Sequence, residues 1–403
     1  MSQDSIHPLQ SKNVRQLSLP EPENDAVQHS EQLIEHIKHS IKTHSGFLPF
    51  NEYMEQALYA AGLGYYSAGS CKLGEEGDFV TAPEISRLFS CCLAKSLQVA
   101  IDPAVERSNI LEVGAGSGIM AADILLQLEK DRHLPQHYFI LERSADLRER
   151  QKKTLEKKCA HLIKRVEWLD DFPEHFNGVV VANELLDALP VHRVKKQQGQ
   201  WQELGVQWNE RFEWASRKIS QSRLLQRLQL IEAEQGELAE GYSTEINLAA
   251  EDWINSIASR IDSGYILLID YGYSQHEYYH PQRQQGTLLC HYRHRAHDDP
   301  FVYPGLQDIT AHVDFTAIAN AGLDAGLKVR GYTTQAFFLM GAGLDELVQT
   351  MDSNDIEQQT KSAGEIRRLT LPQEMGESFK VILLCKNTEK TLPGFTMDMR
   401  DRL

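Results

Sequence analysis

The feature that most constrains this chain is a glycine-rich turn, Glu112-Val-Gly-Ala-Gly-Ser-Gly118. Residues 110–113 form a short apolar run of strand length, and apolar residues recur at helical spacing from 119 to 128. Glycines at 114, 116 and 118 allow a tight turn and let a ligand lie against the backbone without meeting a Cβ. Amide groups at the start of the following helix would then point at that ligand. A glycine loop alone is also compatible with a plain strand–helix turn.

Strand-like and helix-like stretches alternate around this turn. Such alternation is typical of a parallel, doubly wound sheet, so we predict an α/β fold with a Rossmann-like sheet. The expected parallel strands are 110–113, 138–141, 163–169, 179–181 and 265–269, with a charged helix over 145–158. Residues 191–195, 201–206 and 211–214 read as an antiparallel insertion, and 328–333 and 379–385 as the last two strands.

The expected domain organisation follows from this pattern. Residues 1–28 are polar and contain three prolines, which predicts a flexible N-terminal tail. Residues 29–105 read as a helical layer, because Leu33, Ile37 and Ile41 recur at helical spacing. A Rossmann-like domain is expected over 106–385, with the antiparallel insertion at about 190–215 and lid segments at about 216–262 and 275–325. Residues 386–403 are expected to be a C-terminal tail.

Composition excludes several classes of protein. A formal charge of −16 argues against nucleic-acid binding, because no excess of cations is present to neutralise phosphates. The six cysteines show no C-x-x-C pair, and no apolar run reaches a membrane-spanning length. The N-terminus resembles neither a signal peptide nor a transit peptide, so we expect a cytoplasmic protein with no membrane insertion.

One histidine-rich stretch could suggest a metal site. Cys290, His291, His294 and His297 have ligand-like spacing, but arginines at 293 and 295 stand between them and disfavour a cation. We expect no metal and interpret the stretch as a polar lid segment.

The ligand at the glycine turn is predicted to be a nucleoside. The dinucleotide pattern G-x-G-x-x-G fails at Ile119, whereas G-x-G-x-G after an acidic residue is typical of methyltransferases. Glu142 closes the next strand, about 20 residues on, where an acidic side chain can reach ribose hydroxyls. An exposed carboxylate at a strand end is the simpler explanation, but the two features in register favour a nucleoside.

A second polar cluster, Ala182-Asn-Glu-Leu-Leu-Asp187, follows the fourth expected strand. Ligands of open α/β sheets bind beyond the carboxyl ends of the strands, so Asn183 and Glu184 are expected beside the reacting group. Asn183 could also cap a helix, and the two roles are compatible.

The chain resembles the MidA-type methyltransferases, a family that includes a mitochondrial complex I assembly factor acting as a protein arginine methyltransferase. The resemblance extends over residues 45–385, with alanine at 82 where the family usually has serine and serine at 90 where many members have glycine. It rests on the blocks at 77–86, 112–118 with Asp123 and Ile124, 183–191, 270–272, 308–315, 335–339 and 375–380.

The resemblance implies a cofactor, S-adenosyl-L-methionine, and residues that hold it. The cofactor would be held by the loop from Glu112 through Gly114, Gly116 and Gly118, and by Glu142. Asn183 is also expected to contact it, and Thr81 and Pro83 are expected to lie over it. Asp170 or Asp171 would meet the adenine amino group, although a turn cap explains that pair equally well. Thr81 to Glu84 also fit a capping box at the start of a helix.

The resemblance further implies an arginine acceptor in a partner protein. Guanidinium stays protonated, so carboxylates would have to grip it and orient one nitrogen. Glu184 is the first candidate for this grip, with Asn183 beside it, and Glu245 is the second, unless it belongs to the first turn of a helix. Two alternatives stay open: a methyltransferase of small molecules or other side chains, and an assembly factor that retains cofactor affinity. A homo-oligomer is compatible with the sequence. An NAD-dependent oxidoreductase is disfavoured by Ile119.

Overall fold

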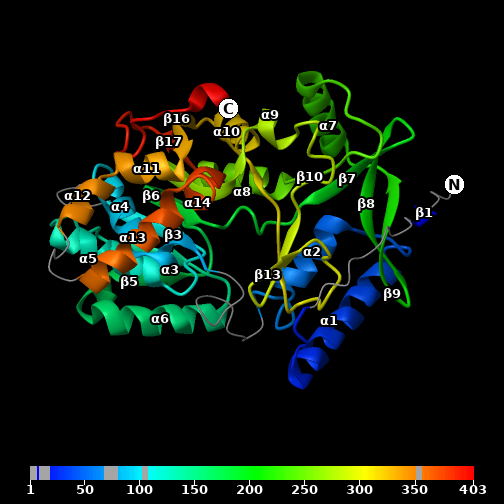
Figure 1. Ribbon diagram of the computed structural model, residues 1–403, viewed down its shortest axis with the longest axis horizontal. Coiled ribbons are helices and arrows are strands. Elements are labelled where there is room, and N and C mark those ends of the chain that lie inside the picture. The colour runs from blue at the N-terminus through cyan, green and yellow to red at the C-terminus, as the bar shows by residue number, and fades with distance from the viewer. Residues whose placement is uncertain (1–6, 9–18, 68–79, 102–107, 351–355) are drawn as a thin grey trace. The chain divides into compact units, whose positions relative to one another are not determined.

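The computed structural model describes residues 7–8, 19–67, 80–101, 108–350 and 356–403. Residues 77–79, at the start of the block expected over the cofactor, and most of the expected N-terminal tail lie outside these ranges. The chain forms two compact units (Figure 1). Unit 1 comprises Met1–Phe79, Asp187–Ala250 and Gln275–Val313, and unit 2 comprises Val80–Leu186, Glu251–Ser274 and Asp314–Leu403.

Unit 2 contains the predicted α/β sheet. Its strands run in the order β16-β17-β11-β6-β3-β4-β5, and β15 also pairs with β11. Strands β11, β6, β3, β4 and β5 are parallel to one another, whereas β17 is antiparallel to both β11 and β16. The bounds are β3 Asn109–Val113, β4 Tyr138–Leu141, β5 Val166–Leu169, β6 Phe176–Asn183, β11 Ile261–Tyr273, β15 Val313–Asp314, β16 Lys328–Thr334 and β17 Phe379–Lys386.

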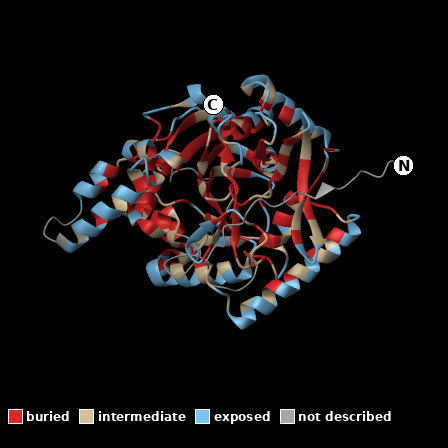
Figure 2. Ribbon diagram, turned by 45° about the vertical axis from the view of Figure 1, so that its right-hand side comes forward, coloured by how far each residue is buried: buried red, intermediate tan, exposed pale blue. Residues whose placement is uncertain are grey.

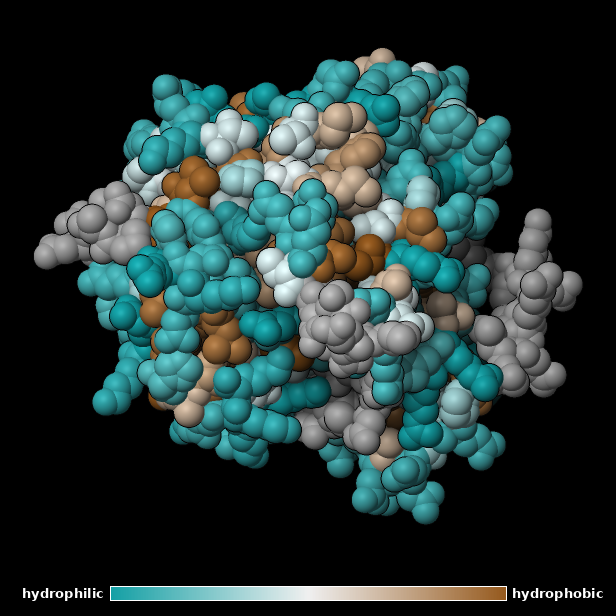
Figure 3. Space-filling model, turned by 60° about the vertical axis from the view of Figure 1, so that its left-hand side comes forward, coloured by the Kyte–Doolittle hydropathy of each residue, from teal (hydrophilic) through white to brown (hydrophobic). Residues whose placement is uncertain are grey.

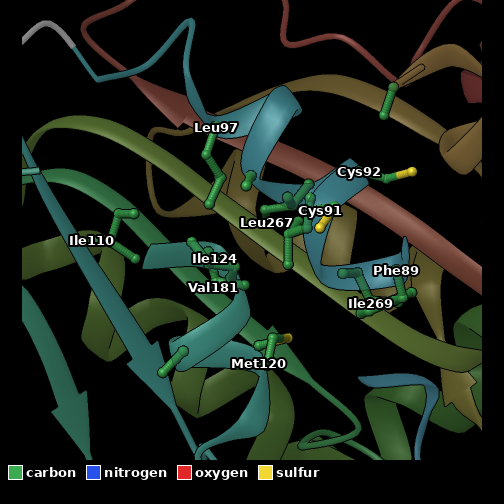
Figure 4. Close-up of a cluster of buried hydrophobic side chains, with 14 of the residues drawn as sticks. Phe89, Cys91, Cys92, Leu97, Ile110, Met120, Ile124, Val181, Leu267 and Ile269 are labelled. Atoms are coloured by element: carbon green, nitrogen blue, oxygen red, sulfur yellow. The ribbon is translucent and has the colours of Figure 1, made fainter. Parts of the chain in front are cut away.

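Alternating side chains of these strands supply the two buried faces of the sheet. Val179 and Val181 join the cluster under α4 and α5, whereas Val180 between them points to the opposite face. Figure 4 shows this cluster, with Met120 and Ile124 of α5 near Val181 of β6. The helices of unit 2 are α3 Ala82–Ile85, α4 Arg87–Leu97, α5 Ile119–Lys130, α6 Ala145–Cys159, α10 Phe315–Asp324, α11 Gln335–Gly341, α12 Leu344–Gln349, α13 Ile356–Thr370 and α14 Met375–Ser378, with 3-10 turns at Ala160–Arg165 and Arg400–Arg402; α8 Leu248–Arg260 begins in unit 1 and continues in unit 2.

Unit 1 is built on an antiparallel sheet in the order β1-β9-β8-β7-β10, with β2 added against β8. The apolar stripe Leu33, Ile37 and Ile41 of α1 is buried in a cluster with Val206 and Phe212 of this sheet. A second sheet has the order β13-β12-β14. The bounds are β1 His7–Pro8, β2 Leu48–Pro49, β7 His192–Gln197, β8 Gln200–Asn209, β9 Arg211–Lys218, β10 Ser243–Ile246, β12 Leu289–Tyr292, β13 Arg295–His297 and β14 Asp308–Thr310, with helices α1 Asn24–Thr43, α2 Phe50–Tyr59, α7 Ser222–Gln235 and α9 Gln275–Tyr278.

The structure differs from the expected organisation in several places. Helix α1 already begins at Asn24, inside the segment 1–28 that was expected to be a flexible tail. Residues 160–165 form a 3-10 turn, because pairing with the short strand β4 starts only at Val166. The helices expected as one N-terminal layer divide between the units, since α1 and α2 belong to unit 1 and α3 and α4 to unit 2. Leu392 and Phe395 are buried in the core of unit 2, within the segment expected to be a tail.

The burial pattern is that of a packed chain. Buried residues follow the strands, and exposed ones the outer sides of the helices (Figure 2). The face drawn in Figure 3 is mostly hydrophilic, as expected for a chain with 24% charged residues. The five cysteines in the described ranges are buried and free. Among the described helices, none combines the length and the apolar character needed to span a bilayer.

Candidate active site

The carboxyl ends of the five parallel strands of unit 2 lie in register. Val113 pairs with Leu141 on one side and Ala182 on the other, Leu141 pairs with Leu169, and Asn183 pairs with Ile269. The residues that follow these positions therefore emerge along one edge of the sheet. They are Gly114, Glu142, Asp170, Glu184 and Asp270.

The glycine loop joins β3 to α5 in left-handed backbone conformations. Gly114, Gly116 and Gly118 have φ angles of 70°, 53° and 80°, which side chains with a Cβ rarely adopt. A Cβ on Gly118 would stand 2.9 Å from the Cα atom of Gln151, so helix α6 also packs directly against the loop. Both constraints select glycine.

Glu112, before the loop, is a buried carboxyl group whose partner is a hydroxyl. Its side chain is 1% exposed, and the Tyr138 hydroxyl donates to Oε2 at 2.6 Å. Burial raises the pKa of Glu112 to about 7, although the hydrogen bond from Tyr138 opposes the shift. This carboxyl group can therefore change charge near neutral pH.

Glu142 lies directly after β4 and is almost completely buried. Oε1 accepts from the backbone N–H of Ser144 at 2.9 Å, and Oε2 accepts from the Gln151 amide at 3.1 Å. Burial raises the pKa of Glu142, and the hydrogen bonds from Ser144 and Gln151 oppose that shift. The carboxylate is thus held in place by groups of the chain itself.

Sequence reasoning missed Gln151. The residue is fully buried on α6, and its amide also donates to the Gly116 carbonyl at 3.1 Å. A signal was present, because Gln151, Leu155 and Cys159 are the buried residues of α6 and recur every four positions. A glutamine in the apolar stripe of an otherwise charged helix needs buried partners.

Asp170 and Asp171 are exposed and bound by arginines. Asp170 pairs with Arg148 Nη2 at 2.8 Å. Asp171 accepts from Arg260 at 3.1 Å and from the backbone N–H of Phe172 at 2.8 Å, and the backbone bond is the main reason why its pKa is lowered. Asp171 therefore acts as a turn cap here, whereas Asp170 lies at the strand-end edge.

The short helix α3 carries Thr81 at its N-cap position and Pro83 in its first turn. The expected capping box does not form, because the Thr81 side chain makes no capping hydrogen bond. Glu84 instead accepts a hydrogen bond from Ser117 of the glycine loop. The backbone N–H of Ala82 donates to Glu184 Oε1 at 3.3 Å, so this helix connects the glycine loop to the loop after β6.

The loop after β6 holds Glu184 in a strained conformation. Its φ angle is 50°, in the left-handed region that non-glycine residues seldom occupy. Two hydrogen bonds fix the loop to the end of β11: Glu184 N–H to Ile269 O at 2.9 Å and Leu186 N–H to Asp270 Oδ2 at 2.9 Å. The Asn183 amide donates to Glu184 Oε1 at 3.1 Å. These hydrogen bonds therefore hold the half-buried carboxylate of Glu184 in one orientation.

Glu245 belongs to unit 1 and is held by partners within that unit. It is 1% exposed on β10, forms an ion pair with Arg193 Nε at 3.4 Å, and accepts from the Thr287 N–H at 2.7 Å. A Cβ on Gly286 would stand 2.4 Å from Glu245 Oε1. These contacts join β10, β7 and the segment before β12.

The histidine-rich stretch forms a hairpin. Strands β12 and β13 pair Cys290 with His297, and the turn residues Arg293 and His294 both have positive φ angles. No group of three or more potential metal ligands occurs among the residues that the structure describes.

The edge of the sheet in unit 2 fits a nucleoside cofactor. The glycine loop exposes backbone where a Cβ would otherwise stand, and Glu142 supplies carboxylate oxygens that suit ribose hydroxyls. Asn183 Oδ1 is buried and has no hydrogen-bond partner within the described ranges. An amide oxygen of this kind is available to a donor on a ligand.

Curated relatives align with most of the chain. A Drosophila melanogaster protein named "Protein arginine methyltransferase NDUFAF7 homolog, mitochondrial" is 29% identical, covering 84% of this chain and 82% of its own. The Mus musculus "Protein arginine methyltransferase NDUFAF7, mitochondrial" is also 29% identical, covering 87% and 84%. Because these relatives are named as mitochondrial, the cytoplasmic location expected from the sequence is contradicted.

A solved structure is similar in both fold and sequence. The crystal structure of a Burkholderia thailandensis protein bound to S-adenosyl-homocysteine matches with a TM-score of 0.91 and 44% identity, over 96% of this chain and 100% of that one. The predicted α/β methyltransferase fold is therefore confirmed. A family model described as "Putative S-adenosyl-L-methionine-dependent methyltransferase" matches residues 92–333. The chain thus belongs to this family of S-adenosyl-L-methionine-dependent methyltransferases, as its glycine loop and its resemblance to the MidA-type enzymes predicted.

Proposed function

We propose that this methyltransferase acts on arginine side chains of a partner protein. The observation that carries the proposal is the carboxylate of Glu184, half-buried and held on a strained loop at the edge where the parallel strands end. The names of the curated relatives, which are protein arginine methyltransferases, support the same acceptor.

The cofactor would be held by unit 2 residues along the strand-end edge. Backbone of the loop with Gly114, Gly116 and Gly118 would lie against it, and Glu142 would accept from its ribose hydroxyls. Glu112 and Asn183 would face it from β3 and β6, with Thr81 and Pro83 above, at the start of α3. Of the two aspartates, Asp170 is proposed to meet the adenine amino group, because it directly follows β5.

When bound, S-adenosyl-L-methionine supplies a methyl group activated by a positively charged sulfur. The chain's main task is then alignment, because an in-line displacement depends on the position of the acceptor more than on proton transfer. Glu184 would grip the guanidinium through charge-assisted hydrogen bonds and direct one nitrogen toward the methyl group. When the N–C bond to the methyl group forms at the expense of the methyl–sulfur bond, with S-adenosyl-homocysteine as the leaving group, the same carboxylate can accept the N–H proton that the guanidinium loses.

The neighbours of Glu184 keep this carboxylate in one orientation. Its Oε1 accepts from the Asn183 amide and from the Ala82 N–H. The loop itself is held by two further hydrogen bonds, from the Glu184 N–H to the Ile269 carbonyl and from the Leu186 N–H to the Asp270 carboxylate. A carboxylate that is already held in the required orientation needs little reorganisation when it binds a cation. Asn183 is therefore proposed as a positioning partner of Glu184.

The proposal is tested with methyl-labelled cofactor and two synthetic peptide mixtures that differ only in arginine or lysine at the central position. We expect label in the arginine mixture, with methylated arginine identified by mass spectrometry. Gly116→Val is the matched control, since a side chain there fills the cofactor loop and should abolish transfer. Label confined to the lysine mixture, or to small molecules added in parallel, would contradict the arginine acceptor.

A further inference from the structure

A fully buried glutamine connects the glycine loop to Glu142 at the end of β4. Gln151 of α6 is 0% exposed, and its side-chain amide makes three hydrogen bonds. Nε2 donates to the Gly116 carbonyl and to Glu142 Oε2, each at 3.1 Å, and Oε1 accepts from the Trp168 indole at 2.9 Å. One side chain thus joins the glycine loop, the end of β4 and strand β5.

The chemistry of these partners permits only one orientation of the amide. A backbone carbonyl and a carboxylate are acceptors, so both require the N–H groups of the glutamine, and an indole is only a donor, so it requires the carbonyl. A flipped amide would lose all three bonds. Trp168 therefore fixes the direction in which Gln151 donates.

The bond to Gly116 sets the direction of a whole peptide unit. Carbonyl and N–H of a planar trans peptide point in opposite directions. Holding the Gly116 carbonyl toward Gln151 therefore turns the Ser117 N–H away from α6. The second bond holds the carboxylate of Glu142 on the same anchor.

We infer that Gln151 is the positioning residue that locks the glycine loop and the Glu142 carboxylate into one cofactor-binding geometry. The inference rests on the proposed role of Glu142 in holding the cofactor. Gln151 does not need to touch the cofactor, because it acts through Gly116 and Glu142.

Neutrality of residue 151 is part of this role. Glu142 already lies near the buried Glu112, and the backbone N–H of Arg143 and the positive charge of Arg148 favour its charged form. Glutamine adds a donor without adding charge. A carboxylate at 151 would instead face Glu142 at hydrogen-bond distance, and the two could not both be ionised without repulsion.

The test compares Gln151→Met, Gln151→Glu and Gln335→Met in the full chain. Gln335 is the matched control, because it is also 0% exposed on a helix and donates one hydrogen bond, to Leu369 O at 2.9 Å. The dissociation constant of S-adenosyl-homocysteine is measured by calorimetry, together with the melting temperature. We expect Gln151→Met to weaken binding about tenfold to about a hundredfold, the range for losing a hydrogen bond to a charged group, and Gln335→Met to bind as wild type.

Gln151→Glu gives a readout that a merely structural glutamine would not move. At pH 8 the introduced carboxylate should repel Glu142 and weaken binding relative to wild type. At pH 6 the introduced carboxyl group can be protonated and can again donate to Glu142, so the ratio of the two dissociation constants should fall several-fold, by about threefold or more. A ratio that stays constant with pH, or Gln151→Met and Gln335→Met losing equal affinity, would overturn the inference.

Glu142→Gln separates this inference from the proposed function. If that variant binds S-adenosyl-homocysteine as tightly as wild type, the role of Glu142 fails and the inference falls with it. If Glu142→Gln weakens binding and Gln151→Met does not, only the inference fails. None of these measurements involves a methyl acceptor, so a wrong arginine assignment leaves them unchanged.

Discussion

Two glutamates that the sequence placed in one catalytic role occupy very different surroundings. Glu184 of unit 2 is half-buried, has a φ angle of 50° and accepts hydrogen bonds from neutral amides. Glu245 of unit 1 is 1% exposed, is paired with Arg193 and is bound by Thr287. The first carboxylate is oriented by amide groups on a strained loop, whereas the second is paired with a guanidinium of its own unit.

The difference offers a way to test which of the two carboxylates is catalytic and which is structural. Strain in the backbone costs free energy and persists where the surrounding structure enforces it, often at active sites. A buried ion pair, in contrast, holds neighbouring segments in one arrangement, and removing one partner leaves the other uncompensated. Replacing Glu184 should therefore change mainly the turnover number, and replacing Glu245 should change mainly the free energy of unfolding.

The largest effect is expected for Glu184→Gln. The loss of the negative charge should lower the turnover number for methyl transfer by about a hundredfold or more, since the transition-state cation loses its partner. The dissociation constant of S-adenosyl-homocysteine should stay near the wild-type value, because the glycine loop and Glu142 are intact. Steady-state kinetics and calorimetry check both values, and a full transfer rate would exclude Glu184 as the grip.

Glu245→Gln should act mainly on stability. Arg193 would lose its anionic partner in a largely buried place, which we expect to lower the free energy of unfolding by about 2 to 4 kcal/mol. Urea denaturation measures this change. Gly286→Ala is a second way to disturb the same contact. The added Cβ would stand 2.4 Å from Glu245 Oε1, and residue 286 has a φ angle of 76°. A stable Glu245→Gln protein that lost methyl transfer would support the catalytic role that the sequence predicted for Glu245.

Glu112 extends the comparison to a buried carboxyl group whose partner is the Tyr138 hydroxyl. Burial raises its pKa from 4.5 to about 7, so the folded state favours the protonated form. Its stabilising contribution is complete below pH 4.5 and is lost as the pH rises through about 7. Relative to Glu112→Gln, wild type should lose about 2 to 3 kcal/mol of unfolding free energy between pH 5 and pH 8. Equal pH dependence in both proteins, measured by denaturation, would contradict this effect of burial.

Asp270→Asn is expected to have the smallest effect. Its two oxygens accept from the N–H groups of Leu186 and Tyr271, and an amide would turn one acceptor into a donor. Because Leu186 lies in the loop that carries Glu184, the turnover number should fall by about tenfold. The affinity for S-adenosyl-homocysteine should change little. A loss of cofactor affinity instead of turnover would show that this loop serves the cofactor.

The sequence predicted the strands of the sheet because each is a continuous local signal. Residues 138–141 were expected as a strand and form β4 with the same bounds, and the antiparallel insertion was expected from alternation and turn residues. The 3-10 turn at 160–165 was missed, since its apolar residues continue into β5 and only the pairing partner sets where the strand starts.

The candidate site was predictable where it follows strand ends and hidden where it depends on distant packing. Gly114, Glu142, Asp170 and Glu184 come directly after strands, so register alone brings them to one edge. Gln151 stands in the middle of a charged helix, and its three partners come from three other segments.

The sequence by itself predicted the glycine loop, the parallel strands of the sheet in unit 2, and the edge at which we propose that the cofactor binds. These depend on residues close together in the chain, where backbone preference and periodicity act. Only the tertiary structure decided that α1 and α2 belong to unit 1, that Glu245 is paired with Arg193, and that Gln151 anchors the loop. Burial and pairing between residues far apart in the sequence decide such roles, and a local pattern carries no record of the partner.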